Sequence, residues 1–340
     1  MIVFFPTYAR RTPTGWTATI AGMVARPLPE KSRRRVLAVA VLRRLLDLDE
    51  SQLESDVFRR RAEAFFFQRL AGRRVRIRLG DREIAPGVSD RTGHFRAEVS
   101  FDADFAAAWA TSQPAGGLRL DYAGVVEDAD GGVEAPATGG IHLVAETGTS
   151  IVSDIDDTVK VTNVADRREL LRNTLVREFM AVEGMPAVYR RWQESGAEFH
   201  YVSSSPWQLS ACLCRFLGDV GLPAGSMHLK LFRLKDSTPL GRLPSRKRSK
   251  RRTIEQIMDD FPARRFLLVG DSGERDPEVY AAIARRRPDQ VAGIMIREVP
   301  TRASRAKVRE RLAKLSRRLP TDGFTVFQSA GDLADLGPVR

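Results

Sequence analysis

The fold of this chain is decided at residues 150–158, which read Ser150-Ile151-Val152-Ser153-Asp154-Ile155-Asp156-Asp157-Thr158. A short apolar run ends there in two aspartates, Asp154 and Asp156, that stand two residues apart. On an extended chain this spacing directs both carboxylates to the same side. Because ligands of an open parallel sheet bind beyond the carboxyl ends of its strands, we expect the two carboxylates to share one site at the end of a strand.

Three later segments supply further polar groups for this site. Asp271 and Asp276 follow a second apolar run, which begins at Phe266. Ser203 stands at the end of another predicted strand, and Lys250 stands at the start of a predicted helix. Acids, a hydroxyl and a lysine at the ends of strands and helices predict a site where Mg²⁺ and a phosphate bind together.

These motifs stand in the same order as those of a known group of enzymes. The Asp-x-Asp-x-Thr run, the later serine, the lysine and the Gly-Asp-x-x-x-x-Asp run resemble the four motifs of haloacid-dehalogenase-type phosphatases. More narrowly, residues 153–158, 201–207 and 270–280 are similar to the actin-patch-protein type of phosphatidate phosphatase. The resemblance covers roughly residues 146–300 and implies a Rossmann-like parallel sheet with minimal caps, and hydrolysis of phosphatidate to diacylglycerol and phosphate.

Asp154 and Asp156 are the expected catalytic pair. An aspartate can attack phosphorus to form an aspartyl-phosphate, which splits one hard step into two, and we assign this role to Asp154. Asp156 is the expected general acid that protonates the leaving alkoxide, and then the base that activates water. The same spacing of acids occurs in calcium loops, but the glycine and distal glutamate of an EF-hand are missing here.

The resemblance also implies a ligand set for Mg²⁺. The set consists of the Asp154 carboxylate, the Asp156 backbone carbonyl and the Asp271 carboxylate, which suffice because Mg²⁺ keeps several waters. Asp276 binds the ion directly, binds it through water or positions Asp271. Its place before Pro277 also suits the N-cap of a helix, and the two roles are compatible.

The remaining polar residues of the motifs are expected to contact the phosphate. Ser203 and Ser204 would present hydroxyls and nearby amides to the phosphoryl oxygens. Lys250 would balance the negative charge of the site as a compact ammonium. The family pattern has a histidine just before this lysine, where this chain has Ser249, so Lys247 is a rival for the role.

Four further residues have lesser expected roles. Thr158 is expected to orient its loop by hydrogen bonding, and Asp157, on the other side of the strand, to cap the next turn. Lys230 and Arg233 lie at the end of a predicted strand over Met227–Phe232. Both either contact a phosphate head group or form pairs within the fold.

The periodicity of the chain predicts two domains, 1–145 and 146–340, in line with its length. In the second domain strands alternate with helices, which is typical of a parallel α/β sheet, and the short gaps between motifs leave no room for a large lid. The first domain is predicted to be a small antiparallel β-sandwich with one or two helices. Its predicted elements are a half-buried edge strand at 16–24, a helix at 36–53, strands at 75–79, 95–101, 118–122 and 141–144, and an exposed hairpin or loop at 124–140. The second domain is predicted to have strands at 150–155, 199–202, 227–232, 266–269, 291–296 and 324–327, and helices at 167–182, 186–195, 206–217, 249–260, 277–287 and 330–336.

The net charge of +12 predicts attraction to phosphate-rich partners. Seven cations and no acid lie in Arg242–Arg252, and nine cations face two acids in Arg297–Arg318. These stretches either contact an anionic membrane peripherally or form a solvated face. Nucleic acid is not an expected partner because no aromatic residues are interleaved with the cations.

The expected location is the cytoplasm, with possible peripheral contact at the membrane surface. The longest apolar stretches, such as 36–42, are too short to cross a bilayer, and the N-terminus lacks the features of a secretory signal. Cys212 and Cys214, two apart on a predicted helix, are expected to be core thiols rather than a disulfide or a zinc pair.

Three functions follow from these observations. The leading one is Mg²⁺-dependent phosphatidate hydrolysis. A second is the same chemistry on a soluble or nucleic-acid phosphate. A third is a non-enzymatic module that docks on a membrane or protein, which the intact set of acids disfavours.

Overall fold

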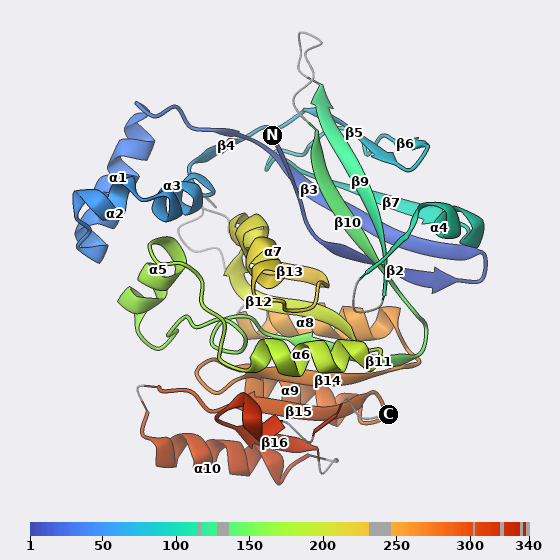
Figure 1. Cartoon of the computed structure of the whole chain (residues 1–340), viewed down its shortest axis with the longest axis vertical. Coiled ribbons are helices and arrows are strands. Elements are labelled where there is room, and N and C mark those ends of the chain that lie inside the picture. Colours follow the sequence, from blue (N-terminus) through green and yellow to red (C-terminus); the bar gives the residue numbers. More distant parts are fainter. Residues whose placement is uncertain are drawn as a thin grey trace. The chain divides into compact units, whose positions relative to one another are not determined.

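The computed structural model of the chain is a mixed α/β structure with one parallel and one largely antiparallel sheet (Figure 1). It describes residues 1–113, 117–127, 136–230, 246–301, 303–319, 323–333 and 336–337, and of residues 246 and 247 only the backbone. Contacts divide the chain into two compact units. The first consists of residues 1–145 and 174–178, and the second of residues 146–173 and 179–340.

The first unit is built on a ten-stranded sheet with the path β1-β3-β2-β10-β9-β5-β6. Its neighbouring strands are antiparallel except β2 and β10, which pair in parallel, and β4 and β7 pair with β3 while β8 pairs with β9. The strands are β1 (Ile2–Phe4), β2 (Thr7–Thr12), β3 (Gly15–Pro27), β4 (Phe67–Arg69), β5 (Arg74–Leu79), β6 (Arg82–Ile84), β7 (His94–Phe101), β8 (Thr111–Ser112), β9 (Leu118–Glu127) and β10 (Ala137–Val144). The helices are α1 (Arg33–Leu46), α2 (Glu50–Glu54), α3 (Asp56–Glu63) and α4 (Ala103–Trp109).

Alternation of apolar and polar residues explains the strands of this unit. In β7, every second side chain from Phe95 to Phe101 is buried and the ones between are exposed. The strands expected at 75–79, 95–101, 118–122 and 141–144 are all present. The hairpin expected at 124–140 is shorter, because β9 continues to Glu127 and β10 begins at Ala137; residues 128–135 lie outside the described part.

Two expectations for this unit are wrong. The strand at 16–24 is not an edge, because β3 pairs with β1 and β2 on one side and with β7 on the other. The helix expected at 36–53 ends at Leu46, where Asp47 adopts a left-handed conformation with φ of 53°. A second helix, α2, begins after Asp49, whose carboxylate accepts a hydrogen bond from the Gln52 backbone N–H.

The second unit is built on a six-stranded, fully parallel sheet. Its order is β13-β12-β11-β14-β15-β16, so the chain builds outward on one side of β11 and then on the other. The strand order reverses between β11 and β14, and sheets of this kind bind ligands beyond the carboxyl ends of the strands at such a reversal. The strands are β11 (Gly148–Ser153), β12 (Glu198–Pro206), β13 (Ser226–Lys230), β14 (Arg264–Asp271), β15 (Val291–Arg297) and β16 (Phe324–Phe327).

Helices cover both faces of this sheet. Figure 1 shows α6 in front of the sheet and α8 and α9 behind it. The central strands are buried on both faces, as their continuous apolar runs predict. The helices are α5 (Arg167–Leu175), α6 (Met185–Glu194), α7 (Ser210–Asp219), α8 (Arg246–Asp260), α9 (Asp276–Arg286) and α10 (Arg305–Ser316), with 3₁₀ turns η1 (Trp207–Leu209) and η2 (Ala330–Leu333).

The predicted strands of this unit are all present, whereas α10 was not predicted and the helix expected at 330–336 is the 3₁₀ turn η2. The helix expected at 167–182 ends at Leu175, and the one expected from Pro206 begins with a 3₁₀ turn. Cys214 is exposed on α7 rather than in the core, and Cys212 is half-buried. In the described part of the chain no helix is long and apolar enough to cross a membrane.

Candidate active site

Three buried aspartates meet at the carboxyl ends of the two central strands. Asp154 is the first residue after β11, Asp271 is the last residue of β14, and Asp276 opens α9. One carboxylate oxygen from each of the three lies within 4.8 Å of the other two. The backbone N–H of Asp154 donates to the carbonyl oxygen of Val269 at 2.9 Å, which ties the two strand ends together.

Lys250 reaches this cluster from α8. Its Nζ donates to Asp154 Oδ1 at 2.9 Å and to Asp276 Oδ1 at 2.6 Å. Burial alone would lower the pKa of this ammonium, but the two carboxylates raise it well above its usual value, so it stays charged. One lysine therefore faces three acids.

The position of Lys250 differs from the expected one. It lies in the second turn of α8, because this helix begins at Arg246 rather than at Ser249. The side chain of its rival Lys247 lies outside the described part of the structure. Of the two, the contacts given above belong to Lys250.

Two carboxylate oxygens of the cluster lack hydrogen bonds. Asp154 Oδ2 and Asp271 Oδ2 are buried and accept none from the described residues. Asp271 Oδ1, in contrast, accepts the backbone N–H groups of Gly273 at 2.6 Å and Glu274 at 3.1 Å. Buried carboxylate oxygens without donors are costly, and a hard cation is the group that such oxygens bind best.

The electrostatics of the cluster also indicate a cation site. Burial, and after it the neighbouring acids, raise the pKa of Asp271 well above its usual range. Burial likewise raises the pKa of Asp154, and the Lys250 ammonium only partly opposes it. The site is therefore short of positive charge, and a divalent cation bound by Asp154, Asp271 and Asp276 would supply it.

The N-cap role expected for Asp276 is wrong. The N-cap of α9 is Arg275, and Asp276 is the first residue inside the helix, with Pro277 after it. Its Oδ2 accepts a hydrogen bond from the Tyr280 hydroxyl at 3.3 Å, one turn later in the same helix. The carboxylate is thus held between α9 and Lys250.

Asp156 is held by a different set of groups. Its Oδ2 accepts hydrogen bonds from the hydroxyls of Ser203 at 3.2 Å and Ser205 at 2.5 Å. Its Oδ1 lies 2.8 Å from the Nζ of Lys160 and accepts the Thr162 hydroxyl at 2.8 Å. Burial alone would raise the pKa of Asp156, but Lys160 and these hydrogen bonds lower it to about 2.

Sequence reasoning missed Lys160. Its side chain is only 2% exposed, and its Nζ also lies 4.9 Å from the centre of the Phe179 ring. The signal in the sequence is a lysine between Val159 and Val161, because a lysine in an apolar run is buried only with a charged partner. That partner is the aspartate four residues earlier.

The loop after β11 is organised by Asp157. This residue has φ of 54°, and its carboxylate accepts the backbone N–H groups of Thr162, Asn163 and Val164 at 2.7–2.8 Å. Its backbone carbonyl accepts a hydrogen bond from Arg297 at 2.8 Å, a contact that sequence reasoning missed. The carboxylate holds the loop in shape, as a cap of the next turn would.

The structure differs from the roles expected for Thr158 and Ser203, and it describes Lys230 but not Arg233. Thr158 is buried, and its hydroxyl has no hydrogen-bond partner among the described residues. Ser203 does not end its strand, because β12 continues to Pro206. Lys230 ends β13 and is half-buried, and Arg233 lies outside the described residues.

Asp276 and Lys250 line a cavity of about 230 Å³, whereas Asp154 and Asp271 are not among its lining residues. Ser204 belongs to its wall, with its hydroxyl 3.4 Å from Glu274 Oε2, whereas Ser203 does not. The cavity is smaller than the roughly 300–1,000 Å³ of pockets that enclose a drug-sized ligand. The lining residues are Val164, Ser204, Lys250, Gly273, Glu274, Arg275, Asp276 and Val279.

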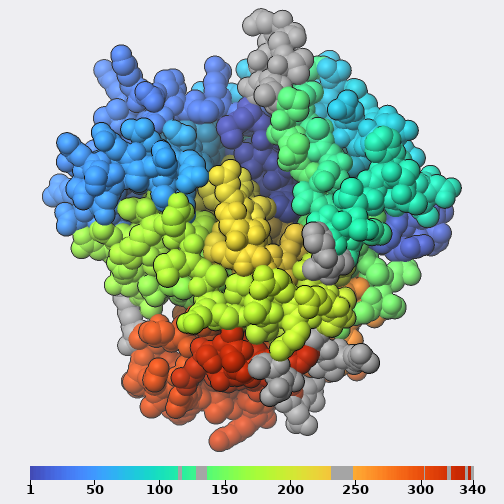
Figure 2. All heavy atoms as spheres, viewed as in Figure 1, coloured from blue at the N-terminus to red at the C-terminus, as the bar shows by residue number. Residues whose placement is uncertain are grey.

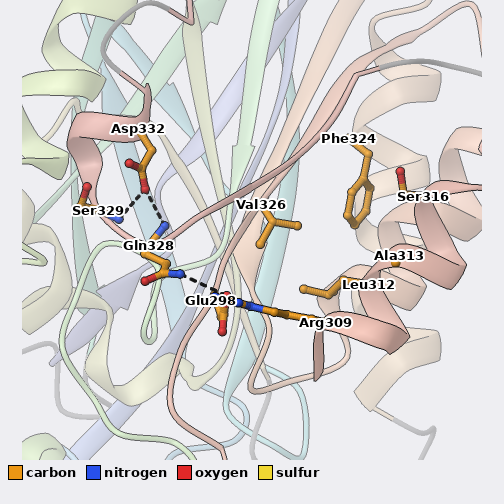
Figure 3. A pocket seen from close by; sticks show the side chains of 10 residues that line it. All are labelled: Glu298, Arg309, Leu312, Ala313, Ser316, Phe324, Val326, Gln328, Ser329 and Asp332. Atoms are coloured by element: carbon orange, nitrogen blue, oxygen red, sulfur yellow. Dashed lines mark hydrogen bonds and ion pairs between the residues drawn. The ribbon is translucent and has the colours of Figure 1, made fainter. Parts of the chain in front are cut away.

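A larger pocket of about 790 Å³ lies elsewhere in this unit, between α10, β16 and η2 (Figure 3). It shares no lining residue with the smaller cavity. Glu298 in its wall accepts hydrogen bonds from Arg309 at 3.1 Å and Gln328 at 3.4 Å. Asp332 accepts the backbone N–H groups of Gln328 and Ser329. These polar side chains therefore have hydrogen-bond partners within the wall of this pocket.

Residues 149–298, which include every residue of this cluster, match the family model described as "Phosphatidate phosphatase APP1, catalytic domain". This segment belongs to that family. Phosphatidate phosphatase APP1 of Saccharomyces cerevisiae is 35% identical over 164 residues, which cover 47% of this chain and 27% of the relative. An uncharacterised protein of Schizosaccharomyces pombe is 36% identical over 156 residues, which cover 45% and 25%.

The chain spans about a quarter of the length of these curated relatives. The match to the APP1 family model covers residues 149–298 and does not extend to the rest of the chain. Among solved structures, a sialyltransferase from Photobacterium damsela aligns at 7% identity over 76% of this chain and 47% of that one. Its TM-score of 0.24 is too low for an argument about the fold.

Proposed function

We propose that this chain is a Mg²⁺-dependent phosphomonoesterase whose substrate is phosphatidate, which it hydrolyses to diacylglycerol and phosphate. The observation that carries the proposal is the buried cluster of Asp154, Asp271 and Asp276 around Lys250. Two of its buried carboxylate oxygens, Asp154 Oδ2 and Asp271 Oδ2, accept no hydrogen bond from the described residues and are suited to bind a cation. Membership of residues 149–298 in the APP1 family supports the substrate.

Asp154, Asp271 and Asp276 would hold Mg²⁺, together with the backbone carbonyl of Asp156. When bound, the ion neutralises phosphoryl charge and orders the reacting oxygens. Carboxylate and carbonyl oxygens are the ligands that Mg²⁺ prefers, and the absence of any cysteine or histidine from this cluster disfavours zinc.

Asp154 is the proposed nucleophile. Lys250 fixes one of its oxygens, Oδ1, and the other, Oδ2, accepts no hydrogen bond from the described residues. Attack on phosphorus forms an aspartyl-phosphate and expels the alkoxide of the substrate. Water then cleaves the aspartyl-phosphate and regenerates the carboxylate.

Asp156 is the proposed proton carrier of both steps. In the free protein it is ionised, because Lys160 and its other donors lower its pKa to about 2 after opposing the effect of burial. A phosphate group placed beside it adds negative charge, which raises this pKa and lets Asp156 take up a proton for the leaving alkoxide. Ser203 and Ser205 hold the carboxylate in place. Ser204, in the cavity wall, is the proposed hydroxyl donor to the phosphoryl group, and Ser203 would join it by turning its single hydroxyl hydrogen away from Asp156.

The size of the cavity is compatible with a lipid substrate. About 230 Å³ admits a phosphate head group, whereas acyl chains would remain outside, as they would in a membrane. The net charge of +12 favours peripheral contact with an anionic membrane. We place the protein in the cytoplasm, on the membrane surface, where the thiols of Cys212 and Cys214 would stay reduced.

The fold supports the same proposal. We assign residues 146–340 to the haloacid-dehalogenase type with minimal caps, since the catalytic acids follow the first and fourth strands of a parallel sheet. Residues 1–145 form the proposed accessory domain. Its strands belong to the ten-stranded sheet described above.

Release of phosphate from different substrates tests the proposal. Phosphatidate in mixed micelles, a small sugar phosphate and a 5′-phosphorylated oligonucleotide are compared with and without Mg²⁺. We expect Mg²⁺-dependent release, fastest from phosphatidate. Equal or faster release from the sugar phosphate or the oligonucleotide would replace the lipid by a soluble substrate, and no release from any would overturn the proposed chemistry.

A further inference from the structure

Helix α1 exposes an apolar stripe on its outer face. The stripe consists of Val36, Leu37, Val41 and Leu45, whose exposed fractions are 58%, 67%, 56% and 51%. Leu37, Val41 and Leu45 follow one another at intervals of four, so they lie on one side of the helix. These four are among the ten large apolar residues that the described part of the chain exposes.

The inner face of α1 is apolar as well. Leu46 is fully buried, and Val39 and Leu42 are half-buried. The helix therefore has a second apolar face beyond the one that its own unit covers. A contiguous exposed apolar stripe ordinarily marks a contact with protein or with lipid, so the outer stripe requires a partner.

The charges of α1 indicate the nature of this partner. The helix has five arginines and no acid, and Arg33, Arg34, Arg43 and Arg44 are exposed at its two ends. Arginines in the first turn oppose the helix dipole and do not stabilise the helix. Arg35 has a partner in Glu63 at 3.6 Å. The pattern is an aliphatic stripe with exposed cations at both ends, which complements a surface that is negatively charged over an apolar layer.

We infer that α1 is a membrane-docking helix that lies flat on an anionic lipid surface. In this arrangement Val36, Leu37, Val41 and Leu45 enter the boundary between head groups and acyl chains, and the arginines at both ends contact lipid phosphates. Fourteen residues are too few to cross a bilayer, so the helix lies in its plane. The stripe contains no aromatic residue, although aromatic anchors are typical of protein interfaces.

The basic stretch Arg297–Arg318 is less suited to this role. Arg309 contacts Glu298 at 3.1 Å, and Arg311 donates to the backbone carbonyl of Ser272 at 2.6 Å. Arg297 holds the loop after β11. Several of its cations therefore have partners within their own unit, whereas α1 combines cations with exposed aliphatic surface.

Sedimentation of the full chain with vesicles tests the inference. The vesicles contain phosphatidylcholine with or without phosphatidylserine, and no phosphatidate, so that binding is measured without hydrolysis. We expect binding to the vesicles with phosphatidylserine, weakened by salt. The double variant Leu37→Gln and Val41→Gln should bind about tenfold more weakly or worse, because it removes aliphatic surface from the lipid contact. The double variant Arg33→Gln and Arg34→Gln should bind more weakly with less dependence on salt.

Val88→Gln is the matched control, because Val88 is 59% exposed in the same unit but lies outside α1. It should bind vesicles as the unaltered chain does, and circular dichroism establishes that each variant is folded. Undiminished binding by the Leu37→Gln and Val41→Gln variant, or no binding by the unaltered chain, would overturn the inference. A dimer that this variant converts to a monomer would also overturn it, because the stripe would then join two copies.

The inference rests on the proposed function in one respect, which is that docking brings the acid cluster to a lipid substrate. The two fail separately. If the chain binds phosphatidylserine vesicles but releases no phosphate from phosphatidate, the proposed function is refuted and the inference about α1 is not. A chain that hydrolyses phosphatidate in detergent micelles but does not sediment with vesicles refutes the docking helix alone.

Discussion

Asp271 shows at the scale of a single residue why this site is suited to a cation. Its Oδ2 is buried without a hydrogen-bond donor among the described residues, and Asp154 Oδ2 is in the same state. Packing in the protein interior does not leave two such oxygens unsatisfied without cost. The cost is recovered when an ion binds, so binding and stability of the folded state are linked.

Removal of this charge should therefore stabilise the metal-free protein. Burial and the neighbouring acids raise the pKa of Asp271, so the folded state binds its proton more tightly than the unfolded state does. Stability of the metal-free protein then falls as the pH rises above the unfolded value near 3.9. At pH 8, Asp271→Asn should therefore raise the free energy of unfolding of the metal-free protein.

Thermal unfolding with and without Mg²⁺ measures this effect. Mg²⁺ should raise the melting temperature of the unaltered chain and change that of Asp271→Asn much less. A variant that Mg²⁺ stabilises as strongly as it does the unaltered chain would exclude Asp271 as a ligand.

Lys160 carries a second prediction at this scale. Without its ammonium, Asp156 would be a buried carboxylate held only by hydroxyls, so Lys160→Met should lower the free energy of unfolding by about 3–5 kcal/mol. Its loss should also raise the pKa of Asp156 and move the acid limb of the pH–rate profile upward. Denaturant unfolding and phosphate release as a function of pH measure the two effects. Lys307→Met, at an exposed lysine on α10, is the control and should change neither.

The loop at 157–164 is the element on which the site depends. One carboxylate, that of Asp157, accepts three backbone N–H groups of this loop. Asp157→Ala should lower the free energy of unfolding by about 2–4 kcal/mol, because it orphans these donors and places alanine at a positive φ. Asp157→Asn keeps an acceptor and tolerates this φ, so it should lose less. An undiminished free energy of unfolding for Asp157→Ala in urea would show that the carboxylate does not hold the loop.

The elements of the second unit could largely be predicted from the sequence. Buried parallel strands are short apolar runs, and Asp154 and Asp271 were found because each follows such a run directly. Lys160 was missed because its ion pair forms across a turn, which periodicity does not describe. Lys250 was found by family resemblance, although its helix begins one turn earlier than expected.

Local conformation limited the prediction elsewhere. The apolar spacing of residues 36–53 continues through Asp47, whose left-handed backbone ends α1. The edge position expected for 16–24 was wrong because pairing with β7 depends on residues far away in the sequence. The outer stripe of α1 could not be predicted, since the sequence does not show which of two apolar faces the unit covers.

At the scale of the whole molecule, the two compact units have different expected tasks. All residues of the acid cluster lie in the second unit, whereas α1 lies in the first. The full chain with Leu37→Gln and Val41→Gln should therefore release phosphate from a water-soluble monoester at a rate close to that of the unaltered chain. It should hydrolyse phosphatidate in vesicles about tenfold more slowly or worse, because part of the aliphatic surface of α1 is missing. Equal rates on vesicles would show that α1 does not deliver the enzyme to lipid.

The most direct test of the catalytic assignment is phosphate release by Asp154→Asn in the presence of Mg²⁺. We predict no detectable release from phosphatidate, with a circular dichroism spectrum and cooperative unfolding like those of the unaltered chain. Asp289→Asn, at an exposed acid outside the site, is the matched control and should retain full activity. Undiminished release by Asp154→Asn would contradict the account, because the buried aspartate at the end of β11 would then not be the nucleophile.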